Sequence, residues 1–425
     1  MEKHIISQKR LKNGSNLIHI KISNWPLSLI SVWFKTGSRY DPIKKEGLAH
    51  FVEHLFFKKT KNYNTPQKKF KEIESLGIEL NAYTTKENTV YYHSQIKEST
   101  EKSISLLLDS LKNHLITAKD VESEKKVILD ELNRDYQDSD SYIYTLAEAN
   151  LWPQDPIGRN ILGTKDSINK ITFKDVKDFI KNNYSQAPDF LFIGDMELTE
   201  VINILNKENL IFKNPTKEKI NETVSSPKLI LINKRPENHL TISISFQTVS
   251  IKNTSENIKL HLLMAYLANG WISKLIDSLR VKHNLSYWVN GQMVALSDRG
   301  YIQFVFNVDK KELNRSLKLI FSEIKKLKQI NIVKDDIEAH KSSLISSIRH
   351  TNITPSALMW WYGWDMSLNG KSETPSSYIN KIKNLDFSDI KEVAKKYFKK
   401  DNLSISIIGN VSKKEVGDII AKIKF

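Results

Sequence analysis

An apolar stretch near the N-terminus carries three side chains that could bind and use a metal ion. Residues 47–57 are mostly apolar, which indicates a buried helix. Spacings of three and four residues place His50, Glu53 and His54 on one face of that helix. Two imidazoles one turn apart can reach one metal ion at about 2.0–2.1 Å, and a carboxylate beside them can take a proton from water. The alternative is a core helix whose histidines bond to backbone carbonyls.

Two histidines do not complete a zinc site, because a catalytic site usually has three protein ligands and one position for water. The chain has no cysteine, so a carboxylate or another nitrogen must be the third ligand. The best candidates lie in a helix that a capping box at residues 117–120 predicts. Glu124 and Glu131 fall two turns apart on its apolar stripe. Burying both carboxylates there is costly unless a positive charge, such as a metal ion, lies beside them.

The order H-x-x-E-H is the inverzincin signature. With Glu131 following His54 after 76 intervening residues, the pattern resembles the pitrilysin (M16) family of zinc metallopeptidases. The flanking residues 36–41, 57–60 and 81–85 are similar to that family too. The resemblance implies one Zn²⁺ per chain. It also implies roles for five residues: zinc ligands His50, His54 and Glu131, general base Glu53, and supporting carboxylate Glu124.

A segment in the second half resembles the part of the family that holds the substrate backbone near the zinc. Arg280 and Tyr287 match its arginine and tyrosine in spacing, although the usual preceding glycine pair is Gly270-Trp271 here. A guanidinium fork and a phenol can bind a carbonyl or stabilise a tetrahedral oxyanion. The alternative is an arginine in a salt bridge at a helix end and a tyrosine in the core.

Residues 79–94 are predicted to form strands because they are rich in β-formers. Within them Asn81, Ala82 and Tyr83 resemble the exposed sheet edge to which, in the family, substrate adds as an extra strand. Such addition gives affinity through backbone hydrogen bonds. The alternative is an ordinary paired strand. Farther along, the aromatic run at residues 359–364 is expected to pack in the core, with a subsite for apolar substrate side chains as the alternative.

The elements that must position these residues occur twice along the chain. Residues 168–177 and 192–195 recur as residues 379–391 and 407–410, which indicates domain duplication. We predict an α+β fold of two homologous domains, residues 1–213 and 228–425, joined by a polar linker at residues 214–227. By the resemblance, each domain is a mostly antiparallel sheet with helices on one face, and the chain is half of a clamshell.

Local patterns place further elements. Asn13-Gly14 between two apolar stretches predicts a hairpin of residues 5–8 and 17–20. In the second half, a helix is expected from about residue 257 through residue 280.

Composition limits the classes of function. The net charge of +15 comes mostly from scattered lysines, without a basic helix or RNA-binding motif, so we expect no nucleic-acid partner. Attraction of acidic peptides is the alternative role for this charge. No apolar run approaches the roughly 18–20 residues of a membrane span, and the first residues lack the features of a signal or transit peptide. The expected location is the cytoplasm.

We therefore expect a zinc endopeptidase in which Glu53 activates zinc-bound water and returns the proton to the leaving amine. In the short-chain branch of the family two chains close around a chamber, so Arg280 and Tyr287 would act on the partner's zinc site. Unstructured peptides are the expected substrates. A homodimer and a heterodimer with a sister chain are both open, as is dedicated maturation of precursors or leader peptides, for example of bacteriocins. A non-catalytic scaffold is disfavoured because the motif is intact.

Overall fold

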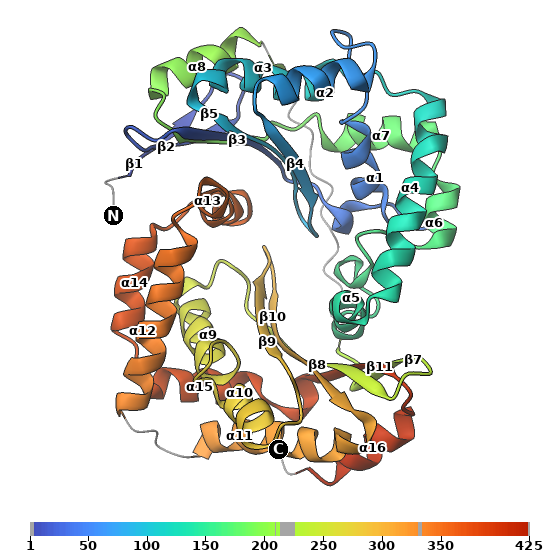
Figure 1. Cartoon of the computed structure of the whole chain (residues 1–425), viewed down its shortest axis with the longest axis vertical. Helices are drawn as coiled ribbons and strands as arrows, with labels where there is room; N and C mark the ends of the chain where they lie inside the picture. The colour runs from blue at the N-terminus through green and yellow to red at the C-terminus, as the bar shows by residue number, and fades with distance from the viewer. Residues whose placement is uncertain (1–3, 209, 213–225, 330–333, 424–425) are drawn as a thin grey trace. The chain divides into compact units, whose positions relative to one another are not determined.

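The computed structural model describes residues 4–208, 210–212, 226–329 and 334–423. These residues form two compact units, and neither is continuous in sequence (Figure 1). Unit 1 contains the described parts of residues 1–133, 159–221 and 352–372, and unit 2 contains those of residues 134–158, 222–351 and 373–425. Residues 134–158, from the first half of the chain, therefore belong to unit 2, and residues 352–372, from the second half, belong to unit 1. The predicted division at the linker did not include this exchange of segments. Most of the predicted linker, residues 214–227, lies outside the described residues.

Unit 1 is built on a six-stranded sheet in the order β1-β2-β6-β3-β5-β4. Its strands are β1 (Ile5–Arg10), β2 (Asn16–Lys21), β3 (Leu27–Phe34), β4 (Glu79–Thr84), β5 (Thr89–Ile96) and β6 (Asp189–Gly194). All neighbours are antiparallel except β2 and β6. The predicted hairpin is confirmed, because β1 pairs with β2 around a turn in which Gly14 has φ +88°. Strand β4 is at one edge of the sheet.

Helices cover both faces of this sheet. They are α1 (Leu48–Leu55), α2 (Pro66–Ser75), α3 (Thr100–Lys112), the first part of α4 (Ala118–Gln137), α6 (Lys165–Lys170), α7 (Phe173–Asn183), α8 (Leu198–Lys207) and α13 (Pro355–Asn369). One face packs against α1, α3, α4, α7 and α8 in a core that contains Ile30, Val32 and Phe34 of β3. The alternate β3 residues Leu29 and Trp33 point to the other face, where α13 packs. Figure 1 shows α13 on the side of the sheet opposite α2 and α3.

Unit 2 repeats this topology. Its strands are β7 (Ile230–Lys234), β8 (His239–Thr248), β9 (Val289–Ala295), β10 (Gly300–Asp309) and β11 (Leu403–Gly409). Their order, β7-β11-β8-β10-β9, matches that of unit 1 without β1, including one parallel pair. The helices of the unit are α5 (Ser139–Leu151), α9 (Thr254–Leu267), α10 (Lys274–Ile276), α11 (Leu313–Gln329), α12 (Lys334–Thr351), α14 (Pro375–Lys383), α15 (Phe387–Tyr397) and α16 (Lys413–Ala421).

The predicted α+β class with two homologous domains is confirmed. We expected helices on only one face of each sheet. In unit 1, however, α13 covers the second face, and in unit 2 helix α5 packs on β8 and β11. No helix in the described ranges is both long and apolar enough to cross a membrane.

The expected continuous helix over residues 257–280 is wrong. Helix α9 ends at Leu267, and Gly270 soon follows with φ +90°, a left-handed conformation that ends helices. The chain then forms the short α10 and a π-helical turn over Asp277–Lys282. The sequence pattern of apolar residues continued through this break, so periodicity alone could not reveal it.

Helix α13 approaches the sheet so closely that only glycine fits at one position. A Cβ atom on Gly363 would lie 2.2 Å from Cζ2 of Trp33. We predict that Gly363→Ala lowers the free energy of unfolding by about 1–3 kcal/mol, because the helix or the buried indole must shift. Urea denaturation would measure this change.

The matched control is Gly417→Ala in α16, where the nearest atom to the new methyl would be 3.8 Å away. It should stabilise the protein slightly, by about 0.5–1 kcal/mol, since alanine favours a helix. Equal effects of the two substitutions would contradict the close packing of α13.

Candidate metal and peptide-binding site

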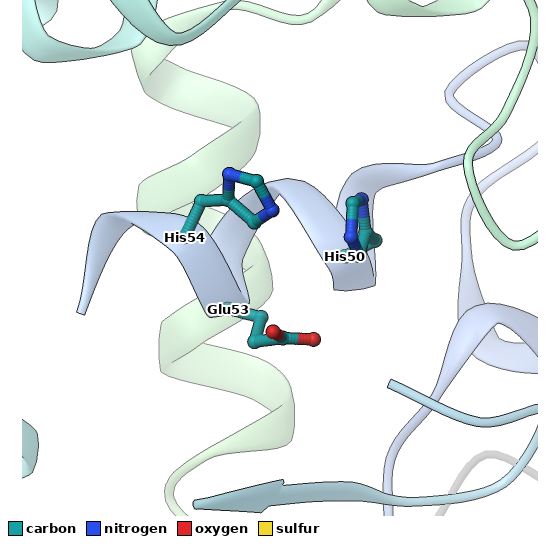
Figure 2. Close-up of side chains that lie close together, drawn as sticks. All are labelled: His50, Glu53 and His54. Atoms are coloured by element: carbon teal, nitrogen blue, oxygen red, sulfur yellow. The ribbon is translucent and has the colours of Figure 1, made fainter. Parts of the chain in front are cut away.

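Helix α1 brings His50, Glu53 and His54 together on one face, as their spacing predicted (Figure 2). One potential ligand atom from each of the three lies within 4.8 Å of the other two. The imidazole rings of His50 and His54 are 4.6 Å apart between centroids and 65° apart in plane. His50 and Glu53 are buried, whereas His54 is partly exposed.

Helix α4 adds Glu131 to this group. Its Oε2 lies 3.8 Å from Nε2 of His50 and 3.7 Å from Nε2 of His54. Ligands of a tetrahedral ion with bonds of about 2.1 Å are about 3.4 Å apart, so small side-chain shifts would complete such a site. Two imidazole nitrogens and one carboxylate oxygen are also a donor set that zinc accepts. The residues therefore fit a small divalent cation.

Glu124, two turns before Glu131, lies behind His54. Its Oε1 is 2.9 Å from Nδ1 of His54, and its other oxygen pairs with Lys58. This hydrogen bond fixes the tautomer, because Nδ1–H donates to the carboxylate and leaves the lone pair on Nε2. Burial lowers the pKa of His54, but the bond to Glu124 and the nearby carboxylates raise it overall. Glu124 thus orients His54 toward Glu131.

Burial changes the protonation of the other two residues on α1. Desolvation, assisted by the neighbouring His54, lowers the pKa of His50 to about 3, so this imidazole is neutral and able to coordinate a metal at neutral pH. Desolvation raises the pKa of Glu53, partly offset by a hydrogen bond in which Thr84 Oγ1 donates to Oε2 at 2.6 Å. Thr84 belongs to β4, so this bond joins the carboxylate to the edge strand.

The N-terminal end of α1 is held by a buried carboxylate. Asp41 accepts hydrogen bonds from the backbone N–H groups of Gly47, at 2.7 Å, and Ala49, at 2.8 Å. Gly47 has φ +92°, and a Cβ there would lie 2.7 Å from the carbonyl oxygen of Leu162. This carboxyl satisfies N–H groups that the start of a helix leaves free, and burial raises its pKa to about 8 despite these hydrogen bonds.

The C-terminal end of α1 is held by Lys69, a residue that is only 1% exposed. Its ammonium donates to the carbonyl oxygens of Phe56, at 3.2 Å, and Lys58, at 3.3 Å, and to Ser110 Oγ at 3.0 Å. A cation is favourable at this end of a helix. Sequence analysis missed Lys69, because it lies among other lysines on an amphipathic helix and nothing distinguishes it there.

The predicted peptide-binding strand has the required topology. Asn81, Ala82 and Tyr83 lie in β4, which pairs with β5 and has no second neighbour in the described sheet. Ala82 is buried in the core beneath α1, whereas Asn81 and Tyr83 are exposed on the other side. The Tyr83 ring lies 5.4 Å from that of Trp360 on α13.

The aromatic run at residues 359–364 contributes to the core between α13 and the sheet. Met359 and Tyr362 are buried there, and the tryptophans at 360, 361 and 364 are partly buried against the same cluster. This agrees with the expectation of core packing.

Arg280 and Tyr287 belong to unit 2, whereas His50 and His54 belong to unit 1. The Arg280 guanidinium carbon lies 4.8 Å from the centre of the Tyr287 ring. It also lies 4.7 Å from the centre of the Trp271 ring. Tyr287 is 80% exposed, so it is not a core tyrosine. No ion pair of Arg280 is found within the described residues. The alternative interpretation, an arginine in a salt bridge at a helix end, is therefore not supported.

Comparison with known families agrees with this fold and these residues. The model of insulinase (peptidase family M16) matches residues 18–165, and that of the peptidase M16 inactive domain matches residues 170–344. Together they span well over half of the chain. The chain belongs to peptidase family M16.

Individual relatives extend over nearly the whole chain. A protein of Rickettsia bellii described as an uncharacterized zinc protease is 27% identical over 94% of this chain and 96% of its own length. The mitochondrial-processing peptidase subunit beta of Neurospora crassa is 24% identical over 94% of this chain and 87% of its own. The crystal structure of a protease from Helicobacter pylori has the same fold, with a TM-score of 0.85 and 21% identity over 96% of this chain and all of that one.

The buried ammonium at the end of α1 should make stability depend on pH. Desolvation lowers the pKa of Lys69 from 10.5 to about 8, against a smaller opposite effect of Asp109. Between these values the unfolded chain binds more protons than the folded chain, so stability rises with pH. Relative to Lys69→Met, the free energy of unfolding should therefore increase by about 2–3 kcal/mol between pH 7.5 and 10.

Urea denaturation of both proteins at the two pH values would measure this difference. Lys68→Met is the control, because Lys68 is exposed on the same helix and should show no such trend. A difference between wild type and Lys69→Met that stays constant with pH would contradict the buried charge.

Proposed function

We propose that this chain is a zinc-dependent endopeptidase with one Zn²⁺ bound by His50, His54 and Glu131. The observation that carries the proposal is the convergence of three ligand atoms, with carboxylate–imidazole separations of 3.7 and 3.8 Å, beside the buried Glu53. Membership of the M16 family supports it, as does the description of the Rickettsia relative as a zinc protease.

When bound, zinc supplies Lewis acidity that polarises a scissile carbonyl and makes water a stronger acid. Glu53 takes the proton from the attacking water and later gives it to the leaving amine. Burial raises the pKa of Glu53, and a stronger base accepts the proton of the attacking water more readily. The Thr84 hydroxyl holds one carboxylate oxygen, so the other oxygen is available to the water.

The substrate in this proposal is an unstructured peptide that adds to the free edge of β4 beside Asn81, Ala82 and Tyr83. The hydrogen bond from Thr84 to Glu53 supports this path, because a strand added at that edge would run past the catalytic base. Arg280 and Tyr287 hold the peptide backbone or the developing oxyanion. In the proposed assembly these two residues come from the second chain of a dimer that encloses a chamber, and the expected location remains the cytoplasm.

A more specialised role is the second candidate. The similarity to mitochondrial-processing peptidase beta subunits favours cleavage of precursor or leader peptides, with a sister M16 chain as partner. A non-catalytic scaffold is the weaker alternative, since such a role would not require the carboxylates and imidazoles to converge.

Substitution of two glutamates should separate metal binding from catalysis. Glu131→Gln should lose most of its zinc, because a neutral amide replaces a charged ligand. Glu53→Gln should keep one zinc per chain while its kcat falls by about 10²–10⁴-fold, the usual contribution of a general base. Metal analysis after dialysis and peptide cleavage would measure both. Glu122→Gln, an exposed position on the same helix, is the control and should change neither. Full zinc occupancy in Glu131→Gln would refute the ligand assignment.

Cleavage of a quenched, unstructured peptide by the chain purified alone tests the function directly. We expect turnover that a chelator abolishes and that added zinc restores. Such turnover would favour a homodimer, because the chain would then provide its own Arg280 and Tyr287. No cleavage of any peptide in a varied library, despite bound zinc, would contradict an endopeptidase that acts without a sister chain.

A further inference from the structure

In unit 2 the Arg280 guanidinium stacks on two exposed aromatic rings, those of Trp271 and Tyr287. The guanidinium carbon of Arg280 lies 4.7 Å from the ring centre of Trp271 and 4.8 Å from that of Tyr287. Trp271 is 72% exposed and Tyr287 is 80% exposed. Trp, Tyr and Arg are the residue types most enriched among those that dominate binding energy at interfaces.

Irregular backbone creates this stack. In one continuous helix, residues 271 and 280 would point in opposite directions, since each residue turns the chain by about 100°. The left-handed Gly270, with φ +90°, and the π-helical turn over Asp277–Lys282 prevent this. Asn284, with φ +51°, then turns the chain back toward Tyr287. Left-handed non-glycine residues and π-helical turns are uncommon and occur frequently at functional sites.

The stack leaves Arg280 preorganised for one kind of ligand. Aromatic rings against the guanidinium restrict its side-chain rotamers, and no hydrogen bond within the described residues uses the N–H donors of its edge. No acidic side chain in the described residues pairs with it. Such an edge binds planar oxygen acceptors, and a side chain already held in place loses less entropy on binding.

We propose that Trp271 is a substrate-positioning residue, whose indole holds the Arg280 guanidinium opposite Tyr287 so that its edge binds the backbone carbonyls of a peptide. This rests on the proposed peptidase function and adds a residue to it. Trp271 strengthens peptide binding by holding Arg280. Its aromatic ring provides this effect, and an apolar side chain of similar size would not.

Binding of a labelled, unstructured peptide to Glu53→Gln protein loaded with zinc tests this without turnover. Adding Trp271→Leu should weaken binding by about three- to fivefold, the value of an exposed cation–π contact. Adding Trp271→Phe should restore most of the affinity, because it retains a ring. The melting temperature should not change, since the side chain is exposed. Ile272→Ala, an exposed apolar neighbour, is the control and should bind normally.

A double-mutant cycle decides whether Trp271 acts through Arg280. In an Arg280→Met background, Trp271→Leu should have no further effect on peptide binding. An equal loss in both backgrounds would overturn the proposal, as would unchanged affinity of Trp271→Leu or failure of Trp271→Phe to restore it. Absence of peptide binding to every protein would overturn it too.

The proposed peptidase function has its own readout. Chelator-sensitive cleavage by protein that retains Glu53, together with equal binding by the Trp271 variants, would refute the role of Trp271 alone. Absence of cleavage by the chain alone would refute a peptidase that acts without a sister chain.

Discussion

Unit 1 depends on keeping several ionisable groups buried around one short helix. Two histidines and the carboxylates of Glu53 and Glu124 lie within or beside the apolar core, where unpaired charges are costly. Glu124 is paired with His54 and Lys58, and Glu53 accepts a hydrogen bond from Thr84, whereas Nδ1 of His50 is buried without a hydrogen-bond partner among the described residues. A cation between the imidazoles and Glu131 would complete this pairing. Because the geometry of three elements must agree, α1, α4 and β4 are fixed relative to one another within the unit.

The helix itself is fixed by buried side chains that form hydrogen bonds with its two ends. Asp41 binds the free N–H groups at the start, and Lys69 binds the carbonyls that follow its last turn. The Lys69 ammonium favours the direction of the helix dipole, whereas burial raises the pKa of Asp41 to about 8, so at neutral pH its carboxyl acts mainly through these hydrogen bonds. Lys69 also bonds the backbone of Lys58, whose side chain holds Glu124, so the ammonium is connected to His54 through two further contacts. A small displacement of the helix end would therefore change the position of the His54 imidazole.

The sequence predicted those features of the fold and site that depend on a regular spacing of residues. The face of α1, the paired glutamates of α4, the hairpin around Asn13-Gly14 and the duplication all follow from periodicity or turn chemistry, which are local. The role of Lys69 could not be predicted, because its burial depends on how α2 packs against the chain after α1. The same holds for the exchange of α5 and α13, since an amphipathic helix does not specify which sheet covers its apolar face.

The segment after α9 shows a different limit. Its apolar pattern resembles a helix, yet Gly270 and the π-helical turn place Trp271, Arg280 and Tyr287 in one stack. In the order of elements, α9 follows β8 as α1 follows β3, so this irregular segment takes the place of α2 before the next strand. Stacking between residues on such backbone is a tertiary effect that propensities do not include.

The most direct test of this account is a crystal structure of the zinc-loaded chain with anomalous diffraction recorded on both sides of the zinc absorption edge. The account predicts one anomalous peak per chain, at about 2.0–2.2 Å from Nε2 of His50, Nε2 of His54 and a carboxylate oxygen of Glu131. Glu53 should lie close to the metal without coordinating it. A peak absent from this position, or one coordinated by Glu53 or Glu124 in place of Glu131, would contradict the central claim.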